Sequence, residues 1–188
     1  MSSKLRNILI LCLLCFPLAQ AVADEYMDTI EVFRKAGESG QFFAKSYGYA
    51  VFPTIGKGGF VVGGAYGTGR VYTKGAYVGD TSMTQLTIGA QLGGQAYSQM
   101  IFFENKKAFD EFTSGNFEFG AQASAVAITA GASAQAGTTG VSAGASGTQE
   151  HATTAAQFNK GMAVFTVAKG GLMYEASIGG QKFSYKKN

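Results

Sequence analysis

Tryptophan is absent from this 188-residue sequence, histidine occurs once, and cysteine occurs twice, at Cys12 and Cys15. Because no cysteine follows residue 15, the rest of the chain can form neither a disulfide framework nor a thiolate metal site. The single histidine, His151, lies in a tract of small polar residues, and no Gly-x-Ser-x-Gly elbow accompanies it. The sequence therefore gives no support for a histidine-based triad or for a metal centre.

Residues 1–23 have the features of a cleaved secretory signal peptide. Lys4 and Arg6 precede an apolar run over residues 8–18, and small residues at 21–23 provide a signal peptidase site before Asp24. The apolar run is shorter than the roughly 20 residues that a membrane-spanning helix needs. A lipid anchor on one of the two cysteines is the alternative, but leucine precedes both of them where a small residue is expected. We expect export to the periplasm or cell envelope, either free or peripheral on a membrane.

Charge of one sign is also scarce. Without Lys4 and Arg6 the chain carries 13 basic and 12 acidic side chains. A near-neutral domain lacks the basic field that attracts nucleic acids, so no nucleic-acid partner is expected. Glycine is abundant instead: all 27 glycines lie beyond residue 23, where Pro53 is the only proline. This composition favours one ordered, β-rich domain over residues 24–188.

The sequence predicts two or three helices. Tyr26, Ile30 and Phe33 recur at helical spacing behind an acidic start, and Gly37 is expected to end this first helix. We expect it to pack on a sheet, with a membrane-surface helix as the alternative. A short helical turn is predicted within residues 41–47. A further helix is predicted after Asn105, a suitable N-cap, and is expected to stop before Gly115.

From residue 50 onward the hydrophobic period changes from 3.6 to 2, which predicts β-strands. The segment "LTIGAQLGGQA" alternates Leu86 and Ile88 with polar residues and predicts one half-buried strand, or two joined at Gly93-Gly94. Other strands are expected at residues 60–66, 71–78, 97–103, 172–178 and around 183–185. Alternation at residues 119–127 predicts one more strand. The Gly/Ala/Ser-rich tract at 130–158 is either strand or flexible loop.

Two segments repeat one another: "AVFPTIGKGG" begins at Ala50 and "AVFTVAKGG" begins at Ala163. In each copy an apolar run precedes Lys-Gly-Gly, which predicts a strand-turn-strand unit used twice. The turn glycines would be Gly58, Gly59, Gly170 and Gly171, because glycine permits positive φ and close backbone approach. Lys57 and Lys169 would then stand at equivalent strand ends.

Signatures of catalysis and cofactor binding are missing. "IGKGG" lacks the first glycine and the Ser or Thr of a phosphate-binding loop, and no dinucleotide fingerprint occurs. Asp110 and Glu111 are neighbours on a helix and point in different directions, which suits solvated charges better than a catalytic pair. No cofactor, metal or catalytic residue is therefore expected. A hydrolase that uses distant carboxylates stays as an alternative, with candidates Asp80, Asp110, Glu111, Glu118 and Glu175.

Several separated blocks resemble the SYLF-domain family in order and spacing. They are "SYGYAVFPTIGKGGFVVGGAYGTGRVY", "TQLTIGAQLGGQAYSQMIFFENKKAFDEF", "FGAQASAVA" and "KGGLMYEASIGG". The resemblance covers roughly residues 26–185. It implies a single SYLF-type domain of α+β class, mainly antiparallel β, and a lipid-binding module. Eukaryotic members bind phosphoinositides and actin filaments, whereas bacterial relatives are exported.

The sequence and the resemblance together predict a non-enzymatic protein that binds phospholipid or a membrane surface in the bacterial envelope. Lys57, Arg70 and Lys169 are the candidate contacts to lipid headgroups, since cations beside apolar turns can meet phosphates. Edge-strand protection is the alternative role of such lysines. A small outer-membrane β-barrel and an actin-binding type of interaction module are the alternative functions.

Overall fold

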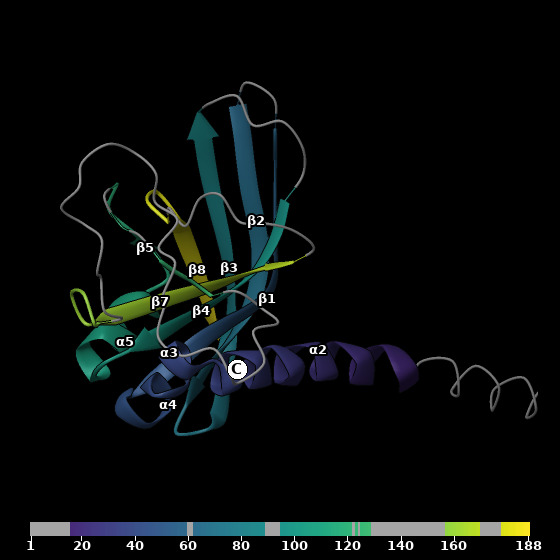
Figure 1. Ribbon diagram of the computed structural model, residues 1–188, viewed down its shortest axis with the longest axis vertical. Coiled ribbons are helices and arrows are strands. Elements are labelled where there is room, and N and C mark those ends of the chain that lie inside the picture. Colours follow the sequence, from purple (N-terminus) through teal and green to yellow (C-terminus); the bar gives the residue numbers. More distant parts are fainter. Residues whose placement is uncertain are drawn as a thin grey trace, which may run out of the picture.

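The computed structural model describes residues 16–59, 62–88, 95–121, 123, 125–128, 157–169 and 178–188. The helices are α2 (Phe16–Lys35), α3 (Gly37–Gly40), α4 (Phe42–Lys45) and α5 (Lys106–Phe112). The strands are β1 (Gly48–Gly59), β2 (Val62–Thr73), β3 (Ala76–Ile88), β4 (Gln95–Phe103), β5 (Phe117–Glu118), β6 (Val126–Ile128), β7 (Met162–Lys169) and β8 (Lys182–Lys187). In Figure 1 the long strands β1, β2 and β3 rise above α2, which crosses the base of the sheet.

One eight-stranded sheet has the order β5-β8-β3-β2-β1-β4-β7-β6. Neighbouring strands are antiparallel except β6 and β7, which are parallel. The predicted α+β class with a mainly antiparallel sheet is confirmed. Pro53 lies within the central strand β1, where the register shifts against both neighbours between residues 51 or 52 and Ile55. A bulge tolerates proline because the ladder hydrogen bond that proline cannot donate is already interrupted there.

The β2–β3 hairpin corrects one predicted strand. Residues 71–78 are not a single strand, because Lys74 and Gly75 form a two-residue turn between Thr73 and Ala76. Both turn residues have positive φ, 50° for Lys74 and 80° for Gly75. Positive φ at both central positions is the geometry that matches the twist of a tight hairpin. Lysine rarely adopts this conformation, which is why the residue pattern did not predict the turn.

The N-terminal helix packs on the sheet as expected. Tyr26, Ile30 and Phe33 are all buried in one cluster with residues of the sheet. The helix begins at Phe16, inside the segment predicted to be a signal peptide, and ends at Lys35. Gly37 does not end this helix as predicted but begins α3, after a bend at Ala36. The short helical turn expected within residues 41–47 is α4.

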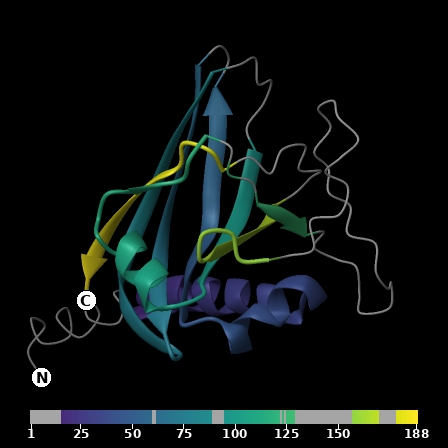
Figure 2. The ribbon, with the colours of Figure 1, turned by 90° about the vertical axis from the view of Figure 1, so that its left-hand side faces the viewer.

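Each face of the sheet carries its own core. On one face α2 and α4 cover the cluster that includes Phe33, Phe42, Phe102 and Phe165, and Figure 2 shows α2 behind the strands. Phe42, Phe102 and Phe165 form a triangle of ring contacts with centroids 5.0 to 5.8 Å apart. These packed rings fix α4 against β4 and β7. We call this face the helix side.

On the opposite face, which we call the inner side, α5 covers a second core. Phe112 of α5 packs on Phe103 and Phe183, with ring centroids 4.9 and 5.1 Å apart. Asn105 caps the helix as predicted, because its side-chain oxygen accepts a hydrogen bond of 3.1 Å from the backbone N–H of Ala108. Figure 2 shows α5 in front of the strands, on the side away from α2.

At the end of β3 the polar residue is buried and the apolar residue is exposed, the reverse of what the hydrophobic pattern predicts. Leu86 is 83% exposed, whereas Gln85 is only 5% exposed. The cost of burying the Gln85 amide is offset because the amide donates a 2.9 Å hydrogen bond to the carbonyl oxygen of Gly179. Of the strand predicted from "LTIGAQLGGQA", residues 86–88 end β3, residues 95 and 96 begin β4, and residues 89–94 lie outside the described residues. Polarity did not identify the buried side of the end of β3.

The repeated segments become β1 and β7, which flank β4 and run in the same direction. Their side chains, however, face opposite sides of the sheet. Phe52 of the first copy lies in the inner core, whereas Phe165 of the second lies in the helix-side core. Lys57 lies two residues before the end of β1 and Lys169 ends β7, and they pair with the adjacent residues Gln95 and Ala96 of β4. The turn and outgoing strand expected after Lys169 lie at residues 170–177, outside the described residues.

Some predictions lie outside the described residues. They concern Gly170 and Gly171, the tract at 130–158 apart from its last two residues, and the strand at 172–178 apart from Ile178. Residues 119–127 include only the start of β6, which is shorter than the predicted strand. Within the described ranges, no helix combines the length and apolarity needed to cross a membrane.

Candidate functional site

The helix side of β2, β3 and β8 is covered at Tyr72 and Tyr77 of the hairpin, but beyond them its side chains are largely exposed and form an open face. Cross-strand partners share a face, and Arg70 is opposite Val51 of the helix-side core and opposite Asp80. The same reasoning extends the open face to β8 through the pairs Asp80 with Lys186 and Thr84 with Lys182. Its ten residues are Tyr66, Thr68, Arg70, Asp80, Ser82, Thr84, Leu86, Lys182, Ser184 and Lys186.

The upper part of the open face is apolar and exposed. Tyr66 is 58% exposed and Leu86 is 83% exposed. Tyr66 is opposite Thr84, and Leu86 is opposite Gly64, so the two side chains are diagonal neighbours on adjacent strands. Large apolar side chains exposed side by side indicate a contact surface when polar residues surround them. Lys182 stands next to them in β8, opposite Thr84.

The lower part of the open face is polar and holds a shallow pocket of about 400 Å³, which we call the Arg70 pocket. Arg70 lies over the ring of Tyr26, 4.3 Å from its centroid, and 5.2 Å from the centroid of Tyr77. These two cation–π contacts hold the Arg70 guanidinium in place. Because Tyr26 belongs to α2 and Tyr77 to β3, the pocket forms where the helix meets the hairpin.

The tyrosines of this region stay neutral. Burial raises the pKa of Tyr26, against a smaller lowering by Thr68 and Arg70. Desolvation raises the pKa of Tyr77, and a hydrogen bond with the Asp80 carboxylate raises it further. A raised pKa keeps both phenols protonated at neutral pH. The charges of the pocket are therefore those of Arg70, Asp80 and Lys186.

Hydroxyl groups line the centre of the pocket. Thr68, Ser82 and Ser184 are directly opposite one another across three strands. The hydroxyls of Ser82 and Ser184 lie 2.7 Å apart and share a hydrogen bond. Each hydroxyl can donate as well as accept. These hydroxyls form the row next to Arg70 and Lys186, where they can donate hydrogen bonds to the oxygens of a phosphoryl group.

The structure separates the three cations predicted to contact headgroups. Arg70 lies on the open face, in the pocket described above. Lys57 lies on the inner side, because it is opposite Ala65 of the inner core. Lys169 lies on the helix side but bonds to Thr54 at 2.6 Å and to Glu25 of α2 at 3.4 Å. Of the three, Arg70 lies on the face that carries exposed Tyr66 and Leu86.

The predicted turn glycines of the first repeat lie in β1. Gly58 and Gly59 pair with Gly64 and Gly63, so the chain reverses after Gly59 rather than at it. A Cβ at Gly58 would meet nothing within 4 Å. The glycines with positive φ among the described residues are instead Gly75, Gly115, Gly161 and Gly180. The prediction that Gly58 and Gly59 make the turn is therefore wrong.

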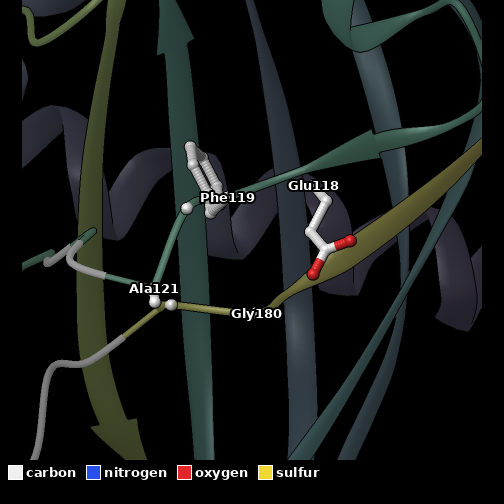
Figure 3. Close-up of a pocket in the computed structure, with 6 residues that line it drawn as sticks. Glu118, Phe119, Ala121 and Gly180 are labelled. Carbon is white, nitrogen blue, oxygen red and sulfur yellow. The ribbon is translucent and has the colours of Figure 1, made fainter.

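A second shallow pocket, of about 460 Å³, lies between β5 and the start of the β8 segment. Figure 3 shows Glu118, Phe119, Ala121 and Gly180 around it. Its one charged group, the Glu118 carboxylate, is 3.6 Å from the ammonium group of Lys182. This lining offers a ligand a single carboxylate and backbone groups, so the Arg70 pocket is the stronger candidate.

The acidic residues considered for hydrolysis lie on different elements. Asp80 is in β3, Asp110 and Glu111 are in α5, and Glu118 is in β5, while Glu175 lies outside the described residues. His151 also lies outside them. In the part of the chain that the structure describes, no three metal-ligating side chains come together. Asp80 alone belongs to the candidate site.

Fold and site define a class of protein: a small α+β domain whose open sheet face combines exposed apolar side chains with a charged pocket, as a binding module does. The chain belongs to the SYLF family. The family model described as "Las17-binding protein actin regulator" (Ysc84) matches residues 84–188. SYLF domains are binding modules of the lipid- and actin-binding type.

A curated relative is the protein called Beta cell expansion factor A, from Aeromonas veronii. It is 29% identical over 163 residues, which are 85% of this chain and 53% of the relative. The chain therefore spans about half the length of the relative that it matches. The similarity extends beyond the family match toward the N-terminus, since 163 residues exceed the range 84–188.

Sequence reasoning missed most of the open face. In the sequence Lys182 and Lys186 alternate with Phe183 and Tyr185, and this alternation alone places both lysines on one side of a strand. Nothing in the sequence showed that this strand would pair with β3, more than 90 residues earlier. The pairing is what brings Lys186 opposite Asp80 and Arg70.

Proposed function

We propose that this protein is a non-enzymatic phospholipid-binding module that acts at a membrane surface in the bacterial envelope. The observation that carries the proposal is the open face, where exposed Tyr66 and Leu86 stand beside a row of cations and hydroxyls. Aromatic and aliphatic side chains can enter the boundary between headgroups and acyl chains. Cations beside them can then meet phosphates. Family membership supports a lipid-binding function at this coarser level.

The direct test is flotation of the purified protein with vesicles of mixed phosphatidylethanolamine and phosphatidylglycerol, at low and high salt. We expect Tyr66→Ser with Leu86→Ser to lower the bound fraction at both salt concentrations. The matched control is Met27→Ser with Val32→Ser, because these residues are also large, apolar and exposed but lie on α2. Equal loss in both double variants would contradict the assignment of the open face.

The contribution of charge is tested separately. Lys182→Glu with Lys186→Glu should lower binding most at low salt, because exposed charges are screened beyond about 8 Å at physiological ionic strength. Lys106→Glu with Lys107→Glu changes the net charge equally but lies on α5, on the inner side. If no variant and no wild-type protein floats with vesicles, the membrane function is wrong, and a protein partner for the open face becomes the better hypothesis.

A further inference from the structure

The Arg70 pocket alternates charge across three strands. Arg70, Asp80 and Lys186 are directly opposite one another on β2, β3 and β8, which gives the order positive, negative, positive. A pocket evolved for a simple anion would not need a carboxylate at its centre, because that carboxylate repels the ligand. A ligand that carries both signs of charge would use all three side chains.

The carboxylate is suited to a primary ammonium group. Asp80 is exposed to solvent, lines the pocket, and accepts a hydrogen bond from Tyr77. An ionised carboxylate has several lone pairs, so it can accept further hydrogen bonds from N–H groups. A quaternary ammonium has no N–H groups and needs free aromatic faces instead. Here Arg70 already occupies the faces of Tyr26 and Tyr77, which favours a primary ammonium.

The cations are suited to a phosphodiester. The tyrosine rings engage the charge of Arg70, and a guanidinium held in this way can still offer its N–H groups to phosphate oxygens. Lys186 and the hydroxyls of Ser82 and Ser184 line the same pocket. Adjacent strands lie about 4.8 Å apart. The two-carbon linker of ethanolamine separates its phosphate from its ammonium by about the same distance.

We propose that the Arg70 pocket recognises a phosphoethanolamine headgroup, with its ammonium on Asp80 and its phosphate on a cation of an adjacent strand, Arg70 or Lys186. This inference rests on the proposed function and gives it a lipid class. Tyr66 and Leu86 lie on the same face, two and three rows further along the strands, respectively, from the row of Arg70 and Asp80. Acyl chains attached to a headgroup in the pocket can extend toward that pair.

The test uses soluble headgroups, so that it does not depend on membrane binding. Glycerophosphoethanolamine and glycerophosphoglycerol are titrated into the isotopically labelled protein, and amide shifts of β2, β3 and β8 are followed by NMR. We expect tighter binding of the ethanolamine compound. Asp80→Asn should weaken that binding by about fivefold and leave the glycerol compound bound equally or more tightly. Asp110→Asn, on the exposed surface of α5, is the control with the same charge change.

Each outcome separates the two proposals. Flotation with vesicles but no shift with either compound, or equal affinity for both in the wild type and in Asp80→Asn, overturns ethanolamine recognition and leaves membrane binding in place. Selective shifts without flotation support the pocket and overturn action at a membrane surface. Preserved dispersion of the spectrum in Asp80→Asn shows that the variant is folded, so that a loss of binding can be assigned to the carboxylate.

Discussion

Two parts of the helix side of this sheet differ in what covers them. Over β1, β4 and β7 the helices bury a layer of aromatic rings, and Phe102 and Phe165 are fully buried there. Over β2, β3 and β8, beyond Tyr72 and Tyr77, the same side of the same sheet is open, with Leu86 and Tyr66 exposed. The comparison indicates that the two parts have different roles. The covered part contributes most of the burial that stabilises the fold, and the open part leaves side chains accessible for binding.

The largest effect should come from the covered part. Phe102→Ala removes a ring that contacts Phe42, Phe43, Tyr49 and Phe165. We expect the free energy of unfolding to fall by about 3–5 kcal/mol, measured by urea denaturation. Leu86→Ala on the open face is the matched control and should change it by less than about 0.5 kcal/mol. A comparable loss in both variants would remove the distinction between the two parts.

A smaller loss of stability is expected at Gly69 of β2, which packs against the inner core on the opposite side of the sheet from the open face. A Cβ at Gly69 of β2 would lie 2.7 Å from the ring of Phe52 and 2.8 Å from the Val51 carbonyl oxygen. Gly69→Ala should therefore destabilise the protein by roughly 1–3 kcal/mol through overpacking. Gly58→Ala, where a Cβ has open space, should be nearly neutral. Thermal unfolding of the two variants measures the difference, and a neutral Gly69→Ala would contradict the packing described here.

The inner side can be weakened without touching either part of the helix side. Asn105→Ala removes the side-chain cap of α5 and should reduce stability by about 1 kcal/mol. Lys107→Ala in the first turn of the same helix is the control and should have little effect. Because α5 lies across the sheet from the open face, vesicle flotation of the folded Asn105→Ala protein should match the wild type. Reduced flotation would place part of the binding surface on the inner side.

The smallest effect is expected at the polar contact between α2 and the sheet. Glu25 accepts hydrogen bonds from Thr54 at 2.9 Å and from Lys169 at 3.4 Å, and its side chain is half exposed. Exposed ion pairs contribute little, so Glu25→Gln should cost less than about 1 kcal/mol. Chemical denaturation at low and high salt checks this, because salt should reduce the difference between variant and wild type. A larger loss would mean that this contact, and not the aromatic layer, holds α2 on the sheet.

The sequence predicted the class of fold and the local elements well, for physical reasons. Helical spacing identified Tyr26, Ile30 and Phe33 as a buried stripe, and the Asn105 cap marked the start of α5 correctly. These signals are local: they depend on residues within one or two turns of each other. Period 2 identified residues 86–88 at the end of β3 for the same reason.

The errors arose where long-range contacts decide the outcome. Gln85 points inward because a carbonyl of the β8 segment is there to receive its amide, and the hydrophobic pattern alone cannot report such a partner. The two Lys-Gly-Gly segments looked equivalent, but the register shift at Pro53 and the opposite facing of the two strands put Lys57 and Lys169 on different sides. Of the predicted headgroup contacts, Arg70 alone lies on the open face.

The central claim is that the open face, and not the inner side, meets the membrane. A polarity-sensitive fluorophore attached to a single cysteine tests it most directly, in a protein where Cys12 and Cys15 are replaced by serine. The label is placed at Leu86→Cys or, as the opposite-face control, at Lys107→Cys. Addition of phosphatidylethanolamine and phosphatidylglycerol vesicles should shift the emission of the label at position 86 to shorter wavelength and leave the label at 107 unchanged. A shift at 107 with none at 86 would contradict the account.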